Sequence, residues 1–143
     1  MFTCLIEQGV DYVVVGAHAL AMHGIPRATG DIDILVRPSA DNAARVVRAL
    51  ERFGAPLEAH GIAASDFERE GNVYQVGLPP RRIDLLTSIT GVDIEDAFRT
   101  RVEASVGALR LQFIGRAALL QNKRATDRPK DRADVIELEK LGR

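Results

Sequence analysis

The chain has 143 residues, of which 46% are hydrophobic and 27% charged, so we expect one globular domain with a sizeable core over residues 1–143. A formal net charge of −1 disfavours nonspecific binding to polyanions, and the single cysteine, Cys4, excludes an internal disulfide. Because no apolar stretch approaches the roughly 20 residues that span a membrane, we expect a cytoplasmic protein without a membrane partner.

The first part of the sequence predicts strands and helices in alternation. A β-branched run at 13–15 favours a strand, and the glycine after it predicts a turn into a helix. Between Ser39, a typical N-cap, and Gly54, a typical C-cap, apolar residues recur at helical spacing. The expected elements are a short helix before residue 12, a strand over 12–16, a helix over 17–23, a strand over 31–36 and a helix over 40–53.

The second part is interrupted more often by glycine and proline. Residues 55–62 have mixed polarity and no clear period, whereas Ser65 to Glu68 fit the capping box of a short helix. Gly77 and the Pro79-Pro80 pair predict a break between two strands. The other expected elements are a strand hairpin from 73–76 and 82–87, a helix over 93–101, a hairpin from 102–106 and 109–114, and helices over 117–124 and 130–141.

Three aspartates interrupt runs that are otherwise typical of buried strands, where an unpaired carboxylate is costly. Asp31 and Asp33 are two residues apart, so on a strand they face the same side, with Cα atoms roughly 6.6 Å apart. Asp84 occupies a second apolar run. If the run around Asp84 forms a strand beside that of Asp31 and Asp33, and Asp84 projects to the same side, the three carboxylates form a site for one or two Mg²⁺ ions. The pattern favours phosphoryl or nucleotidyl transfer.

The order of these motifs resembles the DNA polymerase beta-like nucleotidyltransferase superfamily, and most closely its small stand-alone prokaryotic members, including those of toxin–antitoxin and abortive-infection systems. The resemblance is carried by Gly16-Ala17, Arg27-Ala-Thr29, Asp31-Ile-Asp33, Ile83-Asp-Leu85 and the tail from Lys123 to Asp134. It implies an α/β (α+β) fold, with helices packed against a mixed β-sheet. It also implies transfer of a nucleoside monophosphate from an NTP to a hydroxyl of a protein or RNA acceptor.

The resemblance further implies a role for each matching residue. Asp31 and Asp33 match the pair that holds two Mg²⁺ ions, and Asp84 matches the third carboxylate, which helps to activate the acceptor. Gly16 matches the first residue of a Gly-Gly or Gly-Ser phosphate motif; Ala17 departs from it, keeping the backbone N–H but lacking a hydroxyl. The expected catalytic and metal-binding residues are Asp31, Asp33 and Asp84, and the expected nucleotide-binding residues are Gly16, Ala17, Arg27, Thr29 and Lys123.

Two other functions remain open at this point. Ala17 favours a catalytically degenerate module that binds nucleotide or a partner, and clustered aspartates also occur in metal-dependent phosphohydrolases. The short chain leaves little room for an acceptor-binding region, which favours a cognate toxin or antitoxin partner, or a homo-oligomer.

Two further groups of polar residues favour ordinary structural roles. His18 and His23, five residues apart, lie on different faces of a helix, so we expect packing or surface roles for them. The basic cluster of Lys123, Arg124, Arg128 and Lys130 is typical of a solvated face, unless Lys123, Arg128 or Lys130 contacts nucleotide or RNA.

Overall fold

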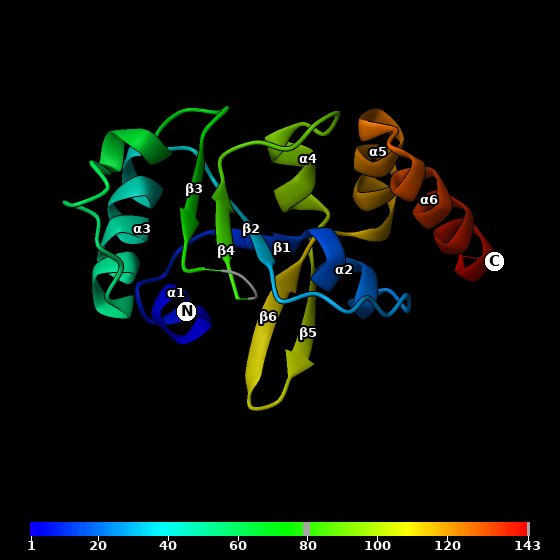
Figure 1. Cartoon of the computed structure of the whole chain (residues 1–143), viewed down its shortest axis with the longest axis horizontal. Coiled ribbons are helices and arrows are strands. Elements are labelled where there is room, and N and C mark those ends of the chain that lie inside the picture. The colour runs from blue at the N-terminus through cyan, green and yellow to red at the C-terminus, as the bar shows by residue number, and fades with distance from the viewer. Residues whose placement is uncertain (79–80, 143) are drawn as a thin grey trace.

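A six-stranded mixed β-sheet forms the centre of the computed structural model, which describes residues 1–78 and 81–142 (Figure 1). Its strand order is β3-β4-β2-β1-β6-β5. The β1/β2, β3/β4 and β5/β6 pairs are antiparallel, whereas β2/β4 and β1/β6 are parallel. The strands are β1 (Tyr12–Val15), β2 (Ile32–Val36), β3 (Val73–Val76), β4 (Ile83–Leu86), β5 (Val102–Val106) and β6 (Leu109–Phe113).

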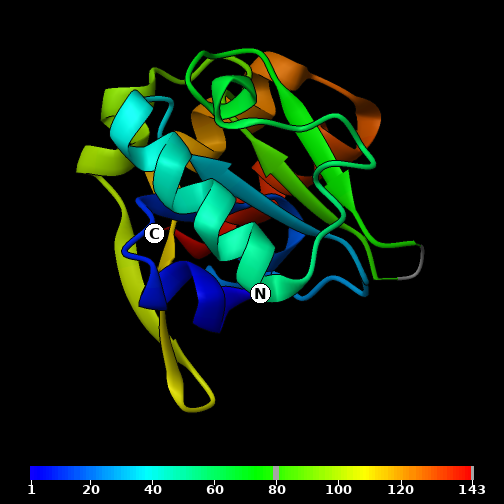
Figure 2. The same ribbon diagram turned by 90° about the vertical axis from the view of Figure 1, so that its left-hand side faces the viewer.

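Helices pack against the mixed sheet, as the resemblance implied. Two views at right angles place α1 and α3 together on one side of the molecule and α5 and α6 together on the other (Figures 1 and 2). The helices are α1 (Phe2–Glu7), α2 (Gly16–Met22), α3 (Ala40–Phe53), α4 (Ile94–Arg99), α5 (Arg116–Thr126) and α6 (Pro129–Leu141), with one 3₁₀ turn, η1 (Ala64–Phe67). None of the helices within residues 1–78 and 81–142 has the length and apolar character needed to cross a membrane.

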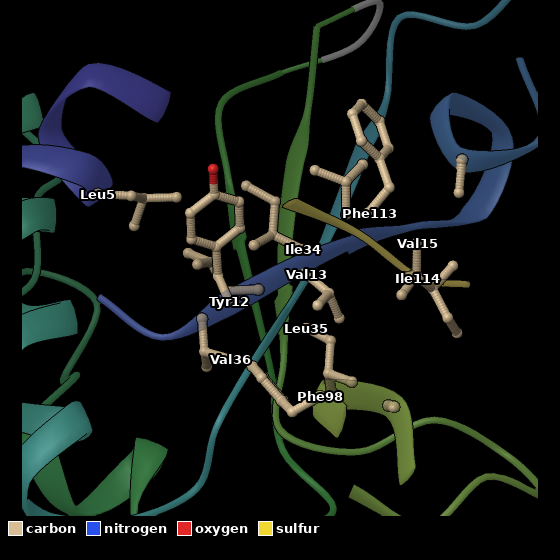
Figure 3. Packing of buried hydrophobic residues seen from close by; sticks show 14 of the residues in the cluster. Leu5, Tyr12, Val13, Val15, Ile34, Leu35, Val36, Phe98, Phe113 and Ile114 are labelled. Carbon is tan, nitrogen blue, oxygen red and sulfur yellow. The ribbon is translucent and has the colours of Figure 1, made fainter. Parts of the chain in front are cut away.

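The core is centred on β1, all four residues of which are buried. Val13 and its β2 partner Leu35 lie toward Phe98 of α4 (Figure 3). Tyr12, the preceding residue, faces α1 instead, with its ring 6.1 Å from that of Phe2. Because successive strand residues point to opposite sides, both faces of β1 are packed, which explains its continuous hydrophobic run.

Several boundaries depend on local capping. Ser39 accepts a hydrogen bond from the N–H of Asn42, and Gly54 adopts the left-handed conformation at φ +93°, so both predicted caps of α3 are confirmed. α4 is shorter than predicted at both ends, because Asp93 lies outside it as the N-cap and Thr100 as the C-cap. In η1, the predicted Ser65 cap is wrong; Asp66 accepts the N–H of Ala63 instead.

The predicted strand pairs are both present as antiparallel neighbours, and segment 55–62 forms turns. The predicted break at Pro79-Pro80 lies outside the described residues. At the start of β2 the strand begins at Ile32, one residue later than predicted, which leaves Asp31 just before the sheet.

Candidate active site

The carboxylates of Asp33 and Asp84 lie side by side on neighbouring strands. In the parallel pairing of β2 with β4, Asp33 is directly opposite Asp84, so both side chains project from the same face. Asp84 is 8% exposed. Burial raises the pKa of the Asp33 carboxyl above its ordinary value, and the negative charges of Asp84 and Asp31 raise it further, against the opposing effect of Arg82. The site therefore favours the binding of positive charge.

Asp31 approaches this pair from the end of the loop before β2. Its side chain is 39% exposed, and its backbone N–H donates a hydrogen bond of 3.1 Å to the Thr29 hydroxyl. Thr29, predicted to bind nucleotide, thus fixes the backbone of one of the three aspartates. The exposed carboxylate of Asp31 sits at the mouth of the site, and the carboxylates on the strands lie deeper.

Gly16 makes the close approach between β1 and Asp33 possible. It follows Val15, the β1 residue opposite Asp33, and begins α2 with φ at +68°. A Cβ atom at this position would lie 2.3 Å from Oδ2 of Asp33. Glycine is therefore required both by the backbone conformation and by the neighbouring carboxylate.

Arg82 is a site residue that the sequence reasoning missed. Its Nε donates to Oδ1 of Asp84 at 2.8 Å and its Nη2 to Oδ2 at 3.2 Å, while Nη2 also lies 3.4 Å from Oδ2 of Asp31. The available signal was strand alternation, because Arg82 precedes Asp84 by two residues and so shares its face. One guanidinium here faces three carboxylates.

Basic side chains approach from the opposite side, held in place by the acids of α6. Arg27, in the loop before β2, forms an ion pair with Asp134. The Nζ of Lys123 on α5 lies 3.3 Å from carboxylate oxygens of both Asp134 and Asp131, and this lysine side chain is only 9% exposed. Because Asp134 contacts both cations, it links the loop, α5 and α6 at the edge of the site.

Asp131 organises the corner between α5 and α6. It is fully buried and accepts hydrogen bonds from the Thr126 hydroxyl at 2.8 Å, from Nε of Arg128 at 2.7 Å and from the Arg128 backbone N–H at 3.1 Å. Burial alone would raise its pKa, but the hydrogen bonds from Arg128, Thr126 and Lys123 outweigh burial and lower the pKa well below its ordinary value. Asp131 is therefore a structural anion that fixes Lys123.

The expected basic cluster divides in the structure. Lys123 and Lys130 line the site, whereas Arg128 is paired with Asp131 and Arg124 with Glu139 on α6. The cluster is thus only partly the solvated face that its composition suggested.

A cavity of about 420 Å³ brings these groups together, within the size range of small-molecule sites. The three aspartates and Arg82 line it from the sheet, and basic residues line it from the loop before β2 and the last two helices. All eight residues expected from the sequence are among its lining residues, which are Gly16, Ala17, Leu20, Arg27, Thr29, Asp31, Asp33, Arg82, Asp84, Lys123, Lys130, Ala133 and Asp134.

The three aspartates fit a divalent cation by donor type and charge. Carboxylate oxygens are the ligands that Mg²⁺ prefers, and three of them beside a single guanidinium leave two negative charges to neutralise. Within residues 1–78 and 81–142, no group of three His, Cys, Asp or Glu side chains is already spaced to hold a metal ion. Some adjustment of these side chains must therefore accompany metal binding.

The two histidines of the α2 region do not line this cavity. Nε2 of His23 lies 2.8 Å from the backbone oxygen of Ile114, which is the satisfied packing role expected for it. His18 lines a separate, apolar cavity with Phe2, Met22 and Phe113, and its buried Nε2 has no hydrogen-bond partner among the described residues.

Comparison with known proteins identifies the fold. No protein-family model and no curated protein matches the sequence. Among solved structures, the chain is similar to the lincosamide antibiotic adenylyltransferase LnuA, solved with lincomycin bound, with a TM-score of 0.59 and 15% identity over 98% of this chain and 92% of LnuA. It is also similar to TM1012 of Thermotoga maritima, assigned as a nucleotidyltransferase, with a TM-score of 0.59 and 15% identity over 98% of this chain and 84% of TM1012. The chain therefore has the nucleotidyltransferase fold.

Proposed function

We propose that this protein is a Mg²⁺-dependent nucleotidyltransferase that transfers a nucleoside monophosphate from an NTP to a hydroxyl of a protein or RNA acceptor. The observation that carries the proposal is the direct pairing of Asp33 with Asp84 across parallel strands, next to Gly16 and at the base of one cavity. Paired carboxylates beside a glycine turn support two-metal phosphoryl chemistry, and the nucleotidyltransferase fold is consistent with it.

Each group has a defined task in this proposal. Asp31, Asp33 and Asp84 hold the Mg²⁺ ions, which when bound supply Lewis-acid neutralisation of the phosphate charge. Arg27 and Lys123 face the triphosphate from the opposite wall, and Gly16 and Ala17 present backbone to it. The acceptor oxygen attacks the α-phosphorus, the bond to the bridging oxygen breaks, pyrophosphate leaves and Asp84 takes the acceptor's proton.

The proposal includes a biological setting, a toxin–antitoxin or abortive-infection system. The ordered aspartate motifs and the tail from Lys123 to Asp134 resemble small nucleotidyltransferases of toxin–antitoxin and abortive-infection systems, which favours a cognate toxin or antitoxin partner. LnuA, by contrast, is an adenylyltransferase of a small-molecule antibiotic, so a small hydroxylated acceptor belongs in the test.

The test is transfer of label from α-³²P NTPs in the presence of Mg²⁺, with tRNA, a protein extract or lincomycin offered as acceptor. We expect transfer from at least one NTP to one macromolecular acceptor, abolished in Asp33→Asn and Asp84→Asn. Asp127→Asn is the matched control, because Asp127 is an exposed carboxylate outside the cavity, paired with Arg132, and it should transfer normally.

The other outcomes separate the alternatives. Thermal stabilisation by NTP without label transfer supports the degenerate binding module that Ala17 favours. Release of phosphate from NTP without an acceptor supports a phosphohydrolase. Label found only on lincomycin places the activity with small-molecule acceptors, and unchanged turnover in Asp33→Asn contradicts the site itself.

A further inference from the structure

Arg82 occupies the position where the carboxylates of Asp84 and Asp31 come together. Its guanidinium engages both oxygens of Asp84, at 2.8 and 3.2 Å, and lies 3.4 Å from one oxygen of Asp31. A two-atom arginine–carboxylate pair is among the stronger polar contacts in proteins. The oxygens that a divalent cation needs are therefore already in contact with a cation that belongs to the chain.

The charges around Arg82 leave this arrangement only partly satisfied. Three carboxylates face its single positive charge, and the ion pairs of Arg82 are with Asp84 and Asp31, not with Asp33. A divalent ion neutralises more of this charge than a guanidinium does. Because arginine stays protonated, it cannot yield the site by losing a proton and must move instead.

Arg82 also has space into which it can move. Its side chain is 31% exposed, compared with 11% for Asp84. It lines a second cavity of about 590 Å³, bordered by His60, Gln75 and Gly77, in addition to the cavity that contains the aspartates. The guanidinium therefore lies between an acidic site on one side and open space on the other.

We propose that Arg82 is an internal counterion that competes with the divalent metal for Asp84 and Asp31, and that it turns toward the second cavity when the metal binds. This makes Arg82 a positioning residue that holds the carboxylates together before the metal arrives. The inference rests on the proposed function, since it takes the aspartates to be the metal site.

The test measures Mn²⁺ binding directly, by the electron paramagnetic resonance signal of free Mn²⁺, in the wild type and in Arg82→Gln. An adjacent arginine changes the proton affinity of a carboxylate by about 1–3 pKa units, so we expect Arg82→Gln to bind Mn²⁺ with a Kd lower by about tenfold or more. Arg132→Gln is the matched control. Arg132 contacts Asp127 through the same two atoms, Nε at 2.8 Å and Nη2 at 3.4 Å, outside the cavity, and its loss should leave the Kd unchanged.

Two more variants keep the result interpretable. Arg82→Lys retains the charge but not the two-atom contact, so it should bind Mn²⁺ with an intermediate Kd, and it replaces Arg82→Gln should that variant fail to fold. Asp33→Asn should weaken Mn²⁺ binding strongly. Equal affinity in wild type and Arg82→Gln, with Asp33→Asn weakened, overturns the counterion inference and leaves the metal site intact. Weaker binding by Arg82→Gln also overturns it, and wild-type binding by Asp33→Asn overturns the metal site and this inference together.

Discussion

Gly16 serves two structural purposes, and comparison with a second glycine, Gly9, can separate them. Gly16→Ala introduces backbone strain at φ +68° and also places a Cβ 2.3 Å from Asp33. Gly9→Ala is a matched control, because Gly9 has φ +67° with no atom within 4 Å of the added Cβ. We expect Gly9→Ala to lower the free energy of unfolding by about 1–2 kcal/mol from strain alone, and Gly16→Ala to lower it by about 1–3 kcal/mol more. Urea denaturation measures both, and equal losses would contradict the close approach to Asp33.

The raised pKa of Asp33 predicts a characteristic pH dependence of stability. The ordinary pKa of an aspartate, 3.8, applies to the unfolded chain, and the pKa of Asp33 in the folded protein is higher. As the pH rises from 3.8 through this higher pKa, the folded protein keeps the Asp33 proton after the unfolded chain has lost it. The contribution of Asp33 to stability therefore falls over this window. Without metal, Asp33→Asn should be more stable than wild type at pH 7, with the difference vanishing below pH 3.8. Urea unfolding in EDTA across this range tests it, and a less stable variant at pH 7 would refute it.

Among the structural elements, the corner between α5 and α6 depends on one buried anion. Asp131 is fully buried, so Asp131→Asn leaves Arg128 and Lys123 without their shared partner and should lower the free energy of unfolding by about 3 kcal/mol. Because the pKa of Asp131 is lowered in the folded state, its contribution is present above pH 3.8 and is lost as pH falls below it. Asp127→Asn, at an exposed pair in the same corner, should change stability little. Unfolding curves at pH 7 and pH 3 compare the two variants.

The local elements were largely predictable because capping and periodicity are local properties. Spacing along the chain placed Asp33 and Asp84 on strands, and the resemblance placed those strands together. Two side chains were missed. Arg82, just before β4, lies two residues from Asp84, and although this spacing places both on one side of the chain, such a pair alone does not indicate a ligand site. The role of Asp134 depends on how α6 packs against the loop that contains Arg27, and no local pattern determines that packing.

At the scale of the whole molecule, the cavity joins the sheet to the last two helices, so a ligand bound there should couple them. Mg²⁺ with a non-hydrolysable NTP analogue at about 100 times its Kd should add about 2.7 kcal/mol of stability. In hydrogen exchange, we expect slower exchange in β4 and in α6 together, with no change at the tip of the β5–β6 hairpin, which does not line the cavity. Omitting Mg²⁺ is the control. Protection confined to one of β4 and α6 would show that the ligand does not bridge them.

The position of the charged residues along the chain has a consequence during protein synthesis. The strands that bring Asp33 beside Asp84, β2 and β4, both end before residue 87. Lys123 and the acids that hold it belong to the last two helices. The parallel neighbour of β1 is β6, which also comes later in the chain. A ribosome therefore synthesises both aspartates before Lys123 is added to the chain. Over that interval Arg82, two residues from Asp84, is the counter-charge nearest to it in the chain.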